Sequence, residues 1–322
     1  MSQMSGMSNC GVEDRELWFQ DGNVVLVAQS RAFRVHRSIL SRHSEIFSNL
    51  FAIPPPSSPD LTEQLDGLPV IPVSDSAHDF KHLLHALYDG SSYLKHEEPI
   101  PFAVLAALAR LAHKYQLDEL LAGACGRLAS VFSADFDQWR ITCGASNSLV
   151  SLEPTDAIEA FHLFRLIDRT DMIPTALYAC CQLPFQDLLQ GVMRADGTLE
   201  KLSSEDLERC LSVREFFTTA FAWMSLTFLD VDPDVRCNQP ALCAESIQKL
   251  RLGPQSGPDI CQGTKLLSNY FSTLAKSMKA DGFICGECLG MLLRRQYNLL
   301  RKIWSDLPAL MQLKDIEWSA DT

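Results

Sequence analysis

The first third of the chain alternates short apolar runs with turns and loops. An apolar, β-branched run at residues 24–28 follows the turn Asp21-Gly22-Asn23, and apolar and polar positions alternate across residues 32–36. Such runs are typical of short strands and predict a β-hairpin. Residues 44–51 then place their apolar side chains at helical spacing, and Pro54 cannot continue a helix. The opening pattern therefore predicts a hairpin followed by a helix.

A second strand and helix are predicted after a break. Residues 54–59 are rich in proline and serine and have the composition of a surface loop. Residues 68–73 follow as a strand, and their two prolines predict an edge position because proline cannot donate to a hydrogen-bonded ladder. Ser76 is expected to cap the next helix, with Asp79 three residues on as in a capping box, and Gly90 is expected to end it.

Helical spacing dominates the remainder. Residues 100–132 carry the best helical pattern of the chain, and a break at residues 116–118 predicts two helices packed as a hairpin. No strand is predicted from residue 135 onward, where an irregular stretch at 230–263 interrupts the helices. The amphipathic runs of this part cover residues 155–168, 173–183, 203–211, 214–229, 266–279 and 289–304. The whole pattern predicts an α+β protein, in which a small sheet flanked by helices precedes a mostly α-helical region.

Composition and charge narrow the class of protein. The 322 residues are 47% hydrophobic, which can supply cores to two ordinary domains. The net charge of −12 disfavours nucleic acid and anionic membrane as partners. No apolar stretch reaches the roughly 20 residues that a membrane span needs, and no signal peptide is recognised. The eleven cysteines are an odd number, so we expect an intracellular protein, of the cytoplasm, the nucleus or both, with reduced thiols.

Two motifs resemble those of a known family. Residues 33–47 read F-x-V-H-R-x-I-L-S-x-x-S-x-x-F, and residues 111–120 read L-A-x-K-Y-x-L-x-x-L. Together with the order of predicted elements, they resemble the BTB/POZ domain. The resemblance divides the chain into a disordered tail (residues 1–14), a BTB/POZ domain (15–132) and a helical C-terminal region (133–322), an arrangement similar to that of many fungal BTB proteins.

The resemblance implies a protein-interaction function without catalysis. BTB/POZ domains form homo- or heterodimers and recruit other proteins, so we expect a homodimer with protein partners. One alternative is a substrate receptor of a cullin-type ubiquitin ligase, to which the element Leu61-Thr62-Glu63 would contribute. Another is a regulator of transcription or chromatin. No catalytic residue is predicted, because the sequence shows no acid/base or nucleophile constellation and no nucleotide-binding motif.

The histidines are interpreted as structural or solvent-facing. His36 is expected to be packed and hydrogen-bonded, since no acid or nucleophile stands near it in sequence. Histidines at positions i and i+4, as at His78 and His82, can clamp a metal ion. On a helical wheel these two and His85 lie opposite the apolar face, so a solvated stripe is predicted there instead of a metal site.

The cysteines carry the sharper chemical hypothesis. Cys285 and Cys288 form a C-x-x-C motif that opens a helix, and Cys237 and Cys243 lie upstream. Four thiolates can close a tetrahedral structural zinc site, with Cys261 as a rival ligand. Ordinary half-buried thiols are the alternative, and a redox motif is disfavoured because no βαβ pattern surrounds the pair. Apart from this zinc ion, no cofactor is predicted.

Overall fold

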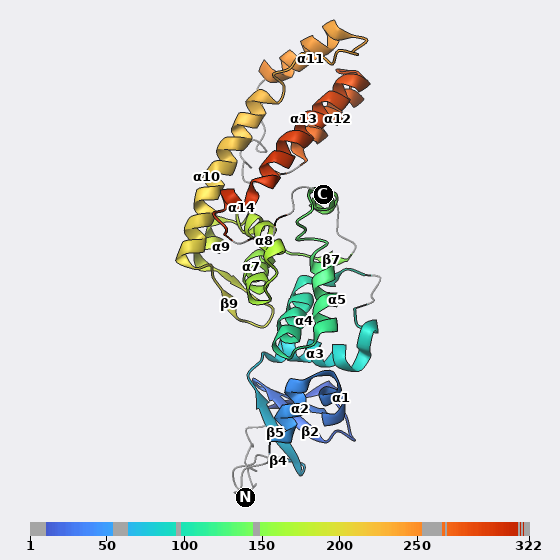
Figure 1. The fold of residues 1–322 in the computed structure, drawn as a ribbon, viewed down its shortest axis with the longest axis vertical. Coiled ribbons are helices and arrows are strands. Elements are labelled where there is room, and N and C mark those ends of the chain that lie inside the picture. The colour runs from blue at the N-terminus through green and yellow to red at the C-terminus, as the bar shows by residue number, and fades with distance from the viewer. Residues whose placement is uncertain are drawn as a thin grey trace, which may run out of the picture. The chain divides into compact units, whose positions relative to one another are not determined.

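The computed structural model describes residues 11–53, 64–94, 98–143, 149–252, 266–267, 269–314, 316 and 318. The chain divides into two compact units. The first contains the residues up to Ala129 together with Ser148–Asp168 and Met193–Glu200, and the second contains Ser130–Asn147, Arg169–Val192 and the residues from Lys201 onward. Figure 1 shows the short strands and helices near the N-terminus and the long helices of the second unit. Among the described residues, no helix is long and apolar enough to cross a membrane.

A five-stranded sheet opens the described part of the first unit, in the order β1-β3-β2-β5-β4. Its strands are β1 (Val12–Trp18), β2 (Val24–Ala28), β3 (Arg31–Val35), β4 (Gln64–Leu65) and β5 (Leu68–Val73). Strands β2 and β3 pair antiparallel with Val24 opposite Val35, which confirms the predicted hairpin. Strand β5 runs parallel to β2. It was expected at the edge, but the two-residue strand β4 pairs with its first residues and lies outside it.

Strand β1 corrects the predicted N-terminal tail. It begins at Val12, inside the segment 1–14 that was expected to be disordered, and runs parallel to β3 with Val12 opposite Arg31. The backbone N–H of Val12 donates to the carbonyl of Ser30 at 2.7 Å. Only Asp14 and Leu17 of this strand are fully buried. Because its side chains are mostly polar, β1 carries no local hydrophobic pattern that would reveal it.

Helices cover the sheet and build the core of the first unit. They are α1 (Arg37–His43), α2 (Glu45–Ala52), α3 (Ala77–Asp89), α4 (Phe102–Lys114), α5 (Asp118–Leu128) and α7 (Asp156–Leu166). The side chain of Ser76 accepts from the N–H of Asp79, and Gly90 ends α3 with a φ of 62°, both as predicted. Phe33, Phe47 and Phe80 are fully buried in the core. Such aromatic side chains contribute the largest apolar areas to a core.

The second unit is helical, as predicted. Its helices are α6 (Phe136–Cys143), α8 (Ile173–Cys180), α9 (Phe185–Gln190), α10 (Ser204–Thr227), α11 (Pro240–Leu252), α12 (Tyr270–Ala280), α13 (Gly286–Ser305) and α14 (Leu307–Leu310). Helix α11 lies within residues 230–263, which were expected to be irregular. The prediction missed it because α11 buries few apolar side chains and so has little amphipathic character. Three two-residue strands, β7 (Val150–Ser151), β8 (Val192–Met193) and β9 (Leu199–Glu200), also lie beyond residue 135, where none was expected.

The compact units do not follow the predicted boundary at residue 132. Helix α7 and the strand segment 193–200 belong to the first unit, although they stand far beyond that boundary in sequence. Charged side chains tie them to the BTB-like part: Arg110 on α4 pairs with Glu159 on α7, and Arg194 pairs with Asp79 on α3. The first unit is therefore larger than the sequence motifs indicate.

Candidate functional site

Four cysteines of the second unit converge on one point. Cys237 lies in the loop before α11, and Cys243 lies on the first turn of α11. Cys285 is the residue that caps the N-terminus of α13, and Cys288 lies on the first turn of that helix. The four sulfur atoms all lie within 4.8 Å of one another. The structure therefore brings together the four cysteines that the sequence singled out, while Cys261 lies outside the described residues.

Backbone N–H groups point at these sulfur atoms. The N–H of Cys285 donates to the sulfur of Cys243 at 3.3 Å, and the N–H of Gln239 donates to the sulfur of Cys237 at 3.4 Å. The N–H of Cys288 donates to the sulfur of Cys285 at 3.5 Å, in the position of a helix N-cap. Donors of this kind, and the positive end of a helix dipole, favour the thiolate over the thiol.

The local environment separates the acidities of the thiols. The hydrogen bond from the N–H of Cys288 lowers the pKa of Cys285 to about 7, although burial opposes this. Burial raises the pKa of Cys243 and of Cys288. Of these three thiols, Cys285 therefore ionises first, and the two buried ones keep their protons unless positive charge is placed against them.

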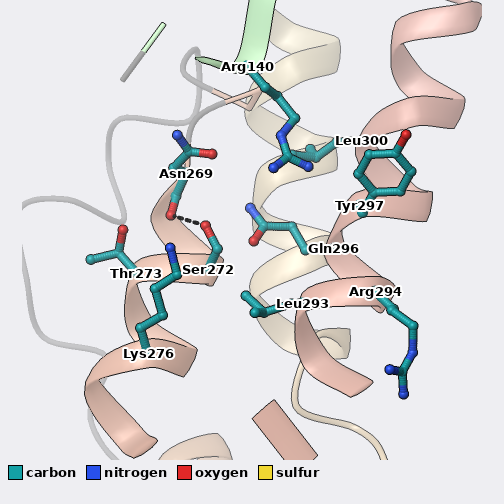
Figure 2. Close-up of a pocket in the computed structure, with 10 residues that line it drawn as sticks. All are labelled: Arg140, Asn269, Ser272, Thr273, Lys276, Leu293, Arg294, Gln296, Tyr297 and Leu300. Carbon is teal, nitrogen blue, oxygen red and sulfur yellow. Dashed lines mark hydrogen bonds between the residues drawn. The ribbon is translucent and has the colours of Figure 1, made fainter. Parts of the chain in front are cut away.

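A cavity of about 460 Å³ lies elsewhere in the second unit, between α12 and α13 (Figure 2). Its lining residues are Arg140, Asn269, Ser272, Thr273, Lys276, Leu293, Arg294, Gln296, Tyr297 and Leu300. Arg140, Lys276 and Arg294 give the lining a positive charge. None of the ten lining residues is a carboxylate, a histidine or a cysteine, so the lining lacks the usual side chains for general acid–base catalysis. Sequence reasoning did not find this cavity, because its walls come from segments far apart in the chain.

A buried cluster of charges lies in the first unit, and sequence reasoning missed it. Arg110 contacts both Asp79 and Glu159. Arg194 lies 3.2 Å from Asp79 and 3.3 Å from Glu159, between the nearest nitrogen and oxygen atoms. Asp79 was predicted only as part of a helix cap. A signal was present, since Arg110 interrupts the otherwise apolar run of α4.

The two carboxylates of this cluster have opposite pKa shifts. Burial raises the pKa of Glu159, and the charges of Arg110 and Arg194 only partly offset it. Burial also opposes the ionisation of Asp79, but the hydrogen bond from His78 and the two guanidinium groups outweigh it and lower the pKa of Asp79. These groups act as structural ion pairs: each arginine bridges carboxylates of different segments, and Arg194 also pairs with Glu200.

The histidines of α3 are less exposed than predicted. His82 is partly buried, and its Nδ1 lies 2.6 Å from the hydroxyl of Tyr93. Burial, together with the neighbouring His78, lowers the pKa of His82 to about 4. His85 lies 3.1 Å from Glu16 on β1, so strand β1 and the segment after α3 cover what was expected to be a solvated stripe. The helical wheel gave the correct face but not the tertiary neighbours that cover it.

His36 has the structural role predicted for it. It precedes α1, and its Nδ1 lies 2.9 Å from the hydroxyl of Tyr88. Its Nε2 lies 3.2 Å from the carboxylate of Asp21. These contacts join the turn before β2 to helix α3 and leave the imidazole packed against Phe19.

Comparison with known families identifies the first unit. The family model of the BTB/POZ domain matches residues 16–129. This segment is a BTB/POZ domain, a class of protein-interaction module that is in general non-enzymatic. The match begins within β1 and ends after α5, so it covers the sheet and the helices packed on it. A search of curated proteins found none that matches the chain.

Proposed function

We propose that this chain is a non-enzymatic adaptor that forms a homodimer through its BTB/POZ domain and recruits a further protein. The domain class supports this, because BTB/POZ domains in general mediate protein–protein interaction and dimerisation. The helical second unit is then the part available to the recruited partner.

The observation that carries the dimer proposal is the open edge of the sheet. Strand β1 stands at one end of the strand order and is seven residues long, whereas β4 at the other end has two. An edge strand presents backbone donors and acceptors to another strand, and pairing of this kind is a common mode of protein recognition. Val12 on this edge is 68% exposed, which adds apolar surface to it.

The test is the mass of the full chain in solution, measured by light scattering at micromolar concentration. We expect a dimer of twice the chain mass of 35.9 kDa. Replacing Val12 by lysine, Val12→Lys, places a charge on the edge and should weaken the dimer at least about tenfold, since charged residues are what natural edge strands use to prevent pairing. Val235→Lys is the matched control, because Val235 is fully exposed in the second unit.

Two outcomes contradict the proposal. A monomeric wild-type chain at tens of micromolar removes the homodimer. A dimer that Val12→Lys and Val235→Lys leave equally intact removes β1 as its interface.

The ubiquitin-ligase alternative stays a prediction. Its sequence basis, Leu61-Thr62-Glu63, lies outside the described residues. A pull-down of purified cullin with the full chain tests it, and the change Leu61→Ala with Glu63→Ala should abolish binding if this element makes the contact. Failure to capture cullin at high concentration eliminates this alternative. A role in transcription or chromatin likewise stays a prediction.

A further inference from the structure

We propose that Cys237, Cys243, Cys285 and Cys288 bind one structural zinc ion in the second unit. Zinc–sulfur bonds of about 2.3 Å in a tetrahedron place the sulfur atoms about 3.8 Å apart. The sulfur atoms of Cys237 and Cys285 are 3.5 Å apart, and all four lie within 4.8 Å of one another. The cluster therefore has the size and the ligand set of a four-thiolate zinc site.

Disulfide bonding accounts less well for this arrangement. A disulfide bond holds its two sulfur atoms about 2.05 Å apart. The separation between Cys237 and Cys285 is well above that value, and the four sulfur atoms form one mutual cluster instead of two separate pairs. A central ion is the simplest group that satisfies all four at once.

The surroundings suit thiolate ligands of a metal. The N–H groups of Gln239, Cys285 and Cys288 each donate to a sulfur of the cluster. Outer hydrogen bonds of this type orient metal ligands and offset their negative charge. Four protein ligands also leave no open position for substrate, so the site is structural and not catalytic.

The packing of α11 gives the ion a purpose. On the described side chains of this helix, burial is confined to Cys243, Ser246 and Ile247, and Leu242 is 46% exposed. Such a helix has too small an apolar face to be held by hydrophobic burial alone. A zinc ion would join its first turn, and the loop before it, to the start of α13. Metal binding of this kind contributes directly to folding free energy.

The first experiment measures the metal content of the full chain, purified under reducing conditions without added metal. Mass spectrometry of the elements should find about one zinc per chain, as four thiolate ligands require. A zinc content below about a tenth of an equivalent, or iron in its place, overturns the proposal for zinc.

A ligand variant with a matched control tests the assignment of residues. Cys237 is only partly buried and lies in a loop, so Cys237→Ser is the change least disruptive to packing. We expect it to reduce zinc content at least about tenfold after dialysis against a mild chelator, because a closed site loses one of its four bonds. Cys125→Ser, in the first unit, should retain zinc as the wild type does. Equal zinc content in both variants overturns the assignment.

Two further measurements keep the test independent of misfolding. Metal-free wild-type chain loaded with Co²⁺ should show the intense visible bands of tetrahedral cobalt bound to thiolates, and their absence counts against the site. Removal of metal should speed hydrogen exchange in α11 and at the start of α13 while leaving strands β2 and β3 unchanged. Unchanged exchange in α11 overturns the structural role. Neither readout depends on whether the BTB/POZ domain dimerises.

Discussion

Arg110 offers the most informative perturbation of the first unit. Its side chain is 18% exposed and contacts two carboxylates, Asp79 and Glu159, which are 5% and 7% exposed. The change Arg110→Met keeps the apolar stem of the side chain and removes the charge. Asp79 and Glu159 are then left to share Arg194, which lies 3.2 and 3.3 Å from them.

The expected cost follows from this geometry. Removing one partner of a buried ion pair costs about 3–5 kcal/mol, because the remaining charge stays buried without compensation. Arg194 remains in place, so we take the lower end, about 3 kcal/mol. For a unit of this size, a loss of about 3 kcal/mol lowers the unfolding temperature by roughly 6–12 °C.

The loss should also depend on pH. The pKa of Glu159 is already raised by burial, and removal of Arg110 raises it further. A raised pKa means that the folded state holds its proton more tightly, so stability falls as pH rises above the ordinary value of 4.5. The penalty of Arg110→Met should therefore be larger at about pH 8 than at about pH 5. The double change Arg110→Met with Glu159→Gln should recover part of the loss.

Hydrogen exchange of peptides from α3 and α7, followed by mass spectrometry, measures this locally. A local measurement is needed because two compact units need not unfold together. The exposed Arg42 supplies the matched control, Arg42→Met. The reasoning is refuted if Arg110→Met accelerates exchange in α7 no more than the control does, or if its effect is the same at both pH values.

Two further predictions concern buried polar groups of the same unit. The hydroxyl of Tyr115 donates to the carboxylate of Asp75, so Tyr115→Phe should cost about 1–3 kcal/mol in urea unfolding, and no loss would show that the bond is not made. The pKa of His82 is lowered to about 4, so the folded state resists protonation and stability should fall as pH drops below the ordinary value of 6.5. Replacing it, His82→Gln, should flatten that decline in thermal unfolding while His113→Gln, at an exposed position, should not; equal curves for both would contradict the assignment.

Local features of the fold could be predicted from the sequence. The hairpin β2–β3, the cap at Ser76 and the end of α3 at Gly90 all depend on residues within a few positions of one another. Periodicity and capping act at this range, so the pattern of residues carries the information directly. The motifs of residues 33–47 and 111–120 lie within the matched BTB/POZ segment for the same reason.

The candidate metal cluster was only half accessible in this way. Spacing identified Cys285 and Cys288 as a pair at the start of a helix, and the cap geometry of α13 agrees with that. Cys243 stands 42 positions before Cys285. Only the path of the chain through α11 and α12 brings it within reach of the pair.

The sequence by itself determined the class of the first unit, the helical nature of the second and the four cysteines to examine. The tertiary structure alone decided that β1 pairs with β3, that α7 joins the BTB/POZ domain through Glu159 and Arg110, and that the four sulfur atoms meet. The physical reason is range. Local backbone preferences are encoded in neighbouring residues, whereas ion pairs and metal clusters form between segments whose proximity depends on the whole packing.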